Sequence, residues 1–75
     1  MERVDGYIAV YRRDEDIILA EVPAIPDCFS DGRTLAEARD RVRDAMLNFL
    51  DELVESGEPI PEDILYVERL ALGAA

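Results

Sequence analysis

The sequence predicts an α+β fold of the order β-β-β-α-β, in which a small antiparallel sheet packs one face on a single long helix. Two observations near the N-terminus and in the middle of the chain predict it. Residues 7–12 and 17–22 alternate between two faces, and residues 35–56 repeat their apolar side chains at helical spacing. A length of 75 residues suffices for one domain, so we expect residues 1–75 to form a single unit.

The first two predicted strands form an antiparallel hairpin. In residues 7–12, Ile8 and Val10 point to one face, while Tyr7, Ala9 and Tyr11 point to the other. The charged residues 13–16 are the expected loop, and the β-branched run 17–22 is the second strand. The loop contains no glycine, which leaves its turn type open.

A stiff connector and a short third strand should follow. Pro23 ends the second strand because proline lacks the N–H that a ladder requires, and Pro26 keeps residues 23–27 extended or at a corner. Residues 28–31 are the expected third strand, and Gly32 supplies the next turn.

The helix is the strongest local prediction. Thr34 and Glu37 have the spacing of a capping box, and apolar residues then recur at three- and four-residue steps to Val54. Gly57 suits the position just after the helix, and Pro59 and Pro61 prevent its continuation. We therefore expect a helix over residues 35–56.

A fourth strand is expected over residues 64–70, with apolar side chains on both faces. A single helix covers only one face of a small sheet, so the other face needs a cover. We expect self-association, as a dimer or a larger homo-oligomer, through these residues: Tyr7, Tyr11, Leu65, Tyr66 and Val67.

The net charge of the chain indicates which kinds of molecule it attracts and which it repels. The chain has 8 basic and 18 acidic residues, a formal charge of −10. Such a chain repels nucleic-acid phosphates and anionic membranes, and it attracts basic proteins. The alternative interpretation is that the acidity only keeps the protein in solution.

The sequence disfavours an enzyme. It has no histidine and one cysteine, Cys28, so it lacks the usual acid–base pairs and a zinc site. Converging carboxylates could hold Mg²⁺ for phosphodiester cleavage, but the net charge repels that substrate. We expect no catalytic residue, no metal and no cofactor. A lone thiol and the lack of a signal peptide or spanning segment favour the cytoplasm.

Several motifs resemble the HicB family of antitoxins. The hairpin 7–16, the run Glu21-Val22-Pro23-Ala24-Ile25-Pro26-Asp27-Cys28-Phe29-Ser30, the helix entry 32–38 and the helix exit 57–61 follow that family's order. Asp27 and Ile17 stand where the family commonly has glycine, and Arg33 replaces a usual acidic residue.

The resemblance implies a stand-alone HicB-like domain with a partly degraded ribonuclease-H-like fold. Many members carry an added C-terminal DNA-binding domain, and we expect none here, which puts autorepression in doubt. The implied function is inhibition of HicA, a small basic mRNA ribonuclease, by protein–protein contact. The expected contacts are these carboxylates: Asp14, Glu15, Asp16, Glu21, Asp27 and Asp31. The alternative is an orphan oligomeric module of the same fold without a toxin partner.

Overall fold

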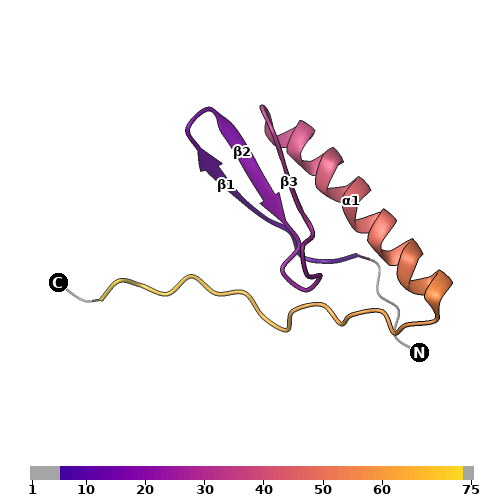
Figure 1. Cartoon of the computed structure of the whole chain (residues 1–75). Helices are drawn as coiled ribbons and strands as arrows, with labels where there is room; N and C mark the ends of the chain where they lie inside the picture. The colour runs from indigo at the N-terminus through magenta and orange to yellow at the C-terminus, as the bar shows by residue number, and fades with distance from the viewer. Residues whose placement is uncertain (1–5, 74–75) are drawn as a thin grey trace.

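A computed structural model describes residues 6–73. It contains a three-stranded antiparallel sheet in the order β1-β2-β3, made by β1 (Val10–Asp14), β2 (Ile17–Glu21) and β3 (Phe29–Gly32). One helix, α1 (Leu35–Ser56), lies along one face of this sheet (Figure 1). The predicted α+β arrangement of a small antiparallel sheet and one long helix is confirmed.

The hairpin is tighter than the sequence suggested. Arg13 and Asp14 were expected in the loop, but they pair with Ile18 and Ile17 in the ladder, and β1 begins at Val10 rather than Tyr7. The turn consists of residues 15–16, and Glu15 has a φ of 57°. A positive φ at a two-residue turn gives the backbone twist that matches the twist of the flanking strands.

The connector between β2 and β3 is a folded loop rather than an extended segment. The Val22 N–H donates to the Cys28 carbonyl at 2.9 Å, and the Ile25 N–H donates to the Val22 carbonyl at 3.0 Å. These bonds turn Ile25 into the core, where 2% of its surface is exposed. Asp27 has a φ of 62°, a left-handed conformation that favours glycine.

The helix begins and ends as predicted. The Thr34 hydroxyl accepts from the Glu37 N–H at 3.1 Å, and the Glu37 carboxylate accepts from the Arg33 N–H at 2.6 Å. At the other end Gly57 has a φ of 76°, and its N–H and that of Glu58 donate to carbonyls of the last turn.

The core lies between the sheet and the first half of α1. Its buried residues are Ala20, Val22, Ile25, Cys28, Ala38 and Val42. The helix lies mainly over β3 and β2 and hardly covers β1. At Gly32 the approach is so close that an added Cβ would lie 2.5 Å from the backbone nitrogen of Ala38, so only glycine fits there.

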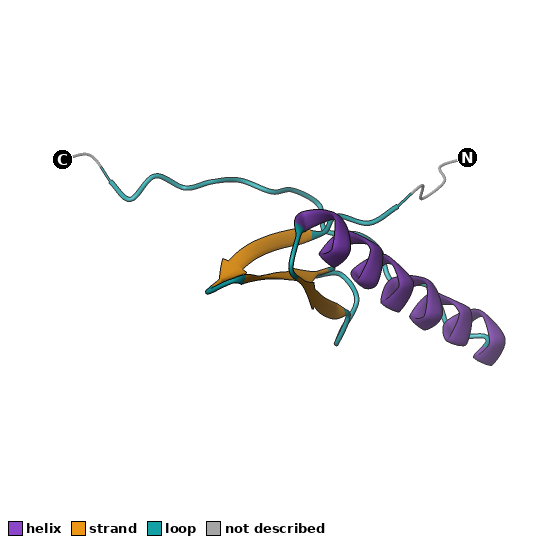
Figure 2. Ribbon diagram, turned by 90° about the horizontal axis from the view of Figure 1, so that it is seen from above, coloured by secondary structure: helices purple, strands orange, loops and turns teal. Residues whose placement is uncertain are grey.

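The predicted fourth strand is the exception. Residues 64–70 contain no strand in the structure, because they pair with no strand of the described chain. They run as an extended C-terminal arm, defined here as residues 64–73, which leaves the body of the molecule (Figures 1 and 2). The radius of gyration is 14.6 Å, whereas a compact chain of this length has about 11 Å.

Candidate functional site

The sheet face turned away from α1 brings three of the predicted carboxylates onto one surface. The ladder register places Asp14, Glu21 and Asp31 on this open face. The remaining residues of the open face are Val10, Arg12, Ile17, Leu19 and Phe29. Charged and apolar side chains therefore alternate on this face, which is hollowed by a pocket of about 430 Å³ lined in part by Arg12, Leu19, Glu21 and Phe29.

The hairpin turn carries the next two predicted residues. Glu15 and Asp16 form the turn itself and are exposed, and Asp14 precedes them at the end of β1. The arginines of β1 do not share one surface, because Arg12 lies on the open face and Arg13 on the opposite one. The turn carboxylates therefore have one arginine near them on each face of the sheet.

Asp31 is already paired within the chain. Its carboxylate lies 3.7 Å from the guanidinium of Arg41, which also reaches Glu37 at 3.4 Å and the Asp31 carbonyl at 3.4 Å. These groups are about half exposed, so the pairs are weak, but they lower the negative charge that Asp31 offers to a partner.

Asp27 belongs neither to the open face nor to the hairpin turn. It sits in the connector at the far end of the sheet, beside a small pocket lined by residues of α1 that include Asn48, Phe49 and Glu52. The structure therefore does not bring all six residues into one site. It places Asp27 next to the second half of the helix.

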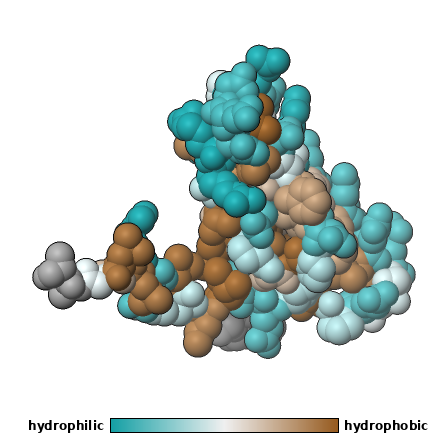
Figure 3. Space-filling model, turned by 60° about the vertical axis from the view of Figure 1, so that its left-hand side comes forward, coloured by the Kyte–Doolittle hydropathy of each residue, from teal (hydrophilic) through white to brown (hydrophobic). Residues whose placement is uncertain are grey.

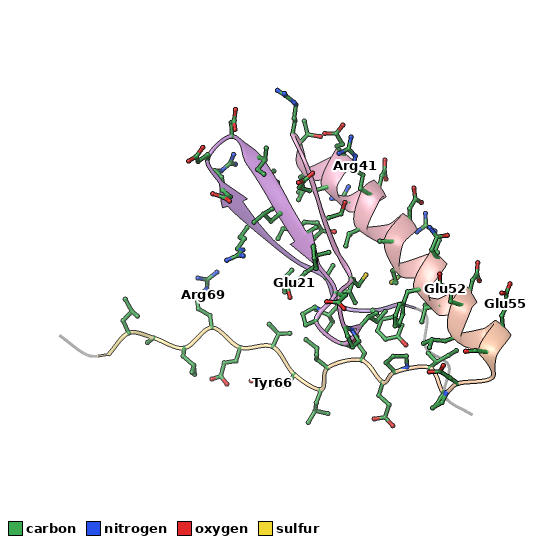
Figure 4. The ribbon with its side chains drawn as sticks, in the orientation of Figure 1. Glu21, Arg41, Glu52, Glu55, Tyr66 and Arg69 are labelled. Atoms are coloured by element: carbon green, nitrogen blue, oxygen red, sulfur yellow. The ribbon has the colours of Figure 1, made fainter. Side chains whose placement is uncertain are left out.

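That second half of α1 carries an acidic surface that the sequence analysis did not single out. Asp51, Glu52 and Glu55 are exposed there, and Glu58 follows the helix. We call these four residues the acidic end; Figure 4 labels Glu52 and Glu55 on it and Arg41 in the first half. The signal was present in the sequence, since no basic residue occurs between Arg43 and Arg69.

The residues predicted for self-association fall into two groups. Tyr7 and Tyr11 are half-buried against the core on the helix side of the sheet, whereas Leu65, Tyr66 and Val67 lie exposed on the arm. The Tyr7 hydroxyl donates to the Pro61 carbonyl, which joins the two groups at the base of the arm. Burial, and secondarily the nearby Asp63 carboxylate, raise the pKa of the Tyr7 hydroxyl.

The one cysteine of the chain lies in the core. Cys28 is buried, and this burial raises the pKa of its thiol more than the backbone bond at Val22 lowers it. A thiol that is kept protonated is a poor nucleophile. Within residues 6–73, no three histidine, cysteine or carboxylate side chains gather closely enough to hold a metal ion. The same residues contain no helix that is both long enough and apolar enough to cross a membrane.

Comparison with known proteins places this chain among relatives of similar length. It is similar to UPF0150 protein Ta0767 of Thermoplasma acidophilum, with 34% identity over 58 residues that cover 76% of this chain and 84% of that protein. It is also similar to UPF0150 protein ssr1258 of Synechocystis sp., with 28% identity over 53 residues that cover 71% and 77%. No solved structure matches the chain significantly. Residues 7–71 match the family described as HicB-like antitoxin of bacterial toxin–antitoxin systems, and the chain belongs to that family.

Proposed function

We propose that this protein binds and inhibits a small basic ribonuclease of the HicA type by protein–protein contact in the cytoplasm. Membership of the antitoxin family supports a role in a toxin–antitoxin pair. The observation that carries the proposed mechanism is the acidic end of α1 together with the carboxylates of the hairpin turn. Both are exposed, and both suit a cationic protein surface.

The charge of the acidic end is not balanced by neighbouring basic groups. The stretch from Asp44 to Glu68 contains eight carboxylates and no arginine or lysine. The last turn of α1 also contains no basic residue, although the C-terminus of a helix favours positive charge. The carboxylates near the C-terminus of α1 therefore interact unfavourably with the helix dipole and with one another. A cationic partner reduces this repulsion on binding.

Competition with RNA follows from the same electrostatics. A ribonuclease that binds RNA presents a basic surface to phosphates, and exposed carboxylates attract that same surface. The open face adds apolar contacts, because Val10, Leu19 and Phe29 lie among its carboxylates. In this role the chain supplies shape and charge, and it needs no catalytic group, metal or cofactor.

The product of the neighbouring reading frame is the first partner to test. The two proteins should co-purify, and the present chain should stop the partner from cleaving RNA in proportion to the complex formed. If the neighbour is not a small basic protein, and no basic ribonuclease binds the chain, the proposal fails.

Charge-neutralising variants locate the contact. The triple change Asp51→Asn, Glu52→Gln and Glu55→Gln should weaken binding by about tenfold or more, since each lost charge pair contributes on the order of 0.5–1 kcal/mol at an exposed site. The turn triple Asp14→Asn, Glu15→Gln and Asp16→Asn should also weaken it. Asp40→Asn, in the arginine-bearing half of α1, is the matched control and should leave affinity unchanged.

A second candidate function is an orphan oligomeric module of the same fold without a toxin. The exposed arm supports it, because Leu65, Tyr66 and Val67 suit contact with another copy. The two functions differ in their partner, so the absence of any basic binding protein together with a stable oligomer would favour this second one.

A further inference from the structure

The arm leaves the molecule as an extended chain with apolar side chains in water. Leu65 is 99% exposed, Leu70 is 75% exposed and Tyr66 is 72% exposed. Figure 3 shows apolar surface running along the arm from its base toward its end. Leucine, tyrosine, valine and isoleucine in an extended conformation suit a strand, and a strand needs a neighbour to satisfy its backbone.

The base of the arm is fixed beside the start of the sheet. The Ile8 N–H donates to both carboxylate oxygens of Asp63, at 3.1 and 3.2 Å, and the Ile64 N–H donates to the same carboxylate at 2.8 Å. The Tyr7 hydroxyl donates to Pro61. From this point β1 runs along the sheet while the arm runs outward (Figure 1), and the apolar side chains of the arm from Leu65 onward are exposed.

The sheet has an open position of the matching kind. In the order β1-β2-β3, β1 has no neighbour on its outer side, so its outward N–H and C=O groups are free within the described residues. Beside β1 lies a groove of about 230 Å³ between the sheet and α1. Its floor includes Tyr11, Val22 and Val42, and its rim carries Arg39 and Arg43.

We infer that the arm of one copy adds as a fourth strand to the outer edge of β1 in a second copy, and that the second copy returns its own arm in the same way. Alternate arm residues then fill the groove beside α1, and the others extend the open face. Glu68 is the acidic residue of the arm and matches the two arginines of the groove rim. The exchange closes as a two-fold dimer, because each copy offers one arm and one β1 edge beside the groove.

The lengths allow this exchange. Nine extended residues, 64–72, span about 30 Å, whereas the five residues of β1 span about 17 Å. The arm can therefore cross the gap between two bodies and still run the full length of β1. The exchange goes beyond antitoxin function and needs no toxin, so its failure leaves the proposed inhibition untouched.

Light scattering and amide hydrogen exchange of the purified full chain over a dilution series test the inference. We expect twice the 8.4 kDa chain mass at high concentration. We also expect protection of the amides of residues 64–70 and of β1, with at least a tenfold loss of arm protection on dilution to monomer. A monomer with a protected arm would show that the arm folds on its own chain. A monomer with an unprotected arm would leave it for a different partner, and a dimer with an unprotected arm would join through another surface. Each of these three results overturns the inference.

A matched pair of variants separates the arm from general hydrophobicity. The double change Tyr66→Asp and Leu70→Asp should give a monomer that keeps the helical circular dichroism signal, since both side chains share the strand face of Glu68 and are exposed in the single chain. Val54→Asp changes an exposed residue of α1, at 63%, and should remain a dimer. A dimer that survives the double arm change contradicts the exchange.

Discussion

The two halves of α1 have the same backbone and different surroundings. The first half, residues 35–43, buries Ala38 and Val42 against the sheet and carries three arginines beside its carboxylates. The second half, residues 44–56, has half-buried apolar residues on one side, and its exposed charged residues are all carboxylates. The first half packs on the sheet and the second half presents charge, so substitutions in the two halves should differ in their effect on stability.

The largest expected effect lies where the first half meets the sheet. Gly32→Ala should lower the free energy of unfolding by about 3 kcal/mol, the upper end for overpacking, because the new Cβ meets helix backbone that cannot move aside. Urea unfolding measures it. Gly6→Ala is the control, since an added Cβ there has nothing within 4 Å. Equal stability of the two variants would show that the helix does not sit on β3 this closely.

A matched pair of truncations compares the halves directly. Val42 is 3% exposed and Val54 is 63% exposed. Val42→Ala should cost about 2 kcal/mol of stability through lost burial and a cavity. Val54→Ala should change stability by less than about 0.5 kcal/mol. Thermal unfolding of both variants would contradict the comparison if the costs were alike.

A hydrogen bond from Tyr7 holds the segment that follows α1. Tyr7→Phe removes the bond to Pro61 and should cost about 1 kcal/mol at neutral pH. Because the pKa of Tyr7 is raised in the folded chain, its contribution is full below the ordinary value of 10.0 and is lost as pH rises through the folded pKa. The variant should therefore lose less stability than the parent chain as pH rises above 10.0. Tyr66→Phe, on the exposed arm, is the control for the neutral-pH cost and should show none.

The smallest expected effect has the opposite sign. Glu55→Gln should raise the free energy of unfolding by about 0.3–1 kcal/mol at low salt, because a negative charge near a helix C-terminus opposes the helix dipole. The same change should weaken binding of a basic partner. A variant that gained stability without losing affinity would show that Glu55 does not contribute to partner binding.

Local sequence signals predicted the elements whose determinants are local. The capping box of Thr34 and the left-handed Gly57 determine where α1 begins and ends, and both are visible in a single sequence. The hairpin loop was predicted too long because the turn needs a positive φ at Glu15, and a glutamate side chain does not indicate a positive φ. The sequence left the connector either extended or at a corner, because the bonds that fold it join backbone groups of Val22, Ile25 and Cys28.

The features that the sequence did not predict depend on contacts between residues that are distant in the chain. Period-two patterning identified residues 64–70 as strand-like, but patterning does not say which edge, or which copy, provides the ladder. Likewise, the six predicted carboxylates were chosen without knowing their directions. The register brings Asp14, Glu21 and Asp31 to one face. Packing of α1 on the sheet pairs Asp31 with Arg41, and the folded connector places Asp27 beside α1.

The salt dependence of the dissociation constant tests the central claim, that exposed carboxylates bind a cationic protein. Calorimetry with the basic product of the neighbouring gene should give a dissociation constant that rises steeply with salt, because added ions screen exposed pairs. The Asp51→Asn, Glu52→Gln and Glu55→Gln variant should bind more weakly and with a shallower slope. Identical slopes for the variant and the parent chain would contradict the account.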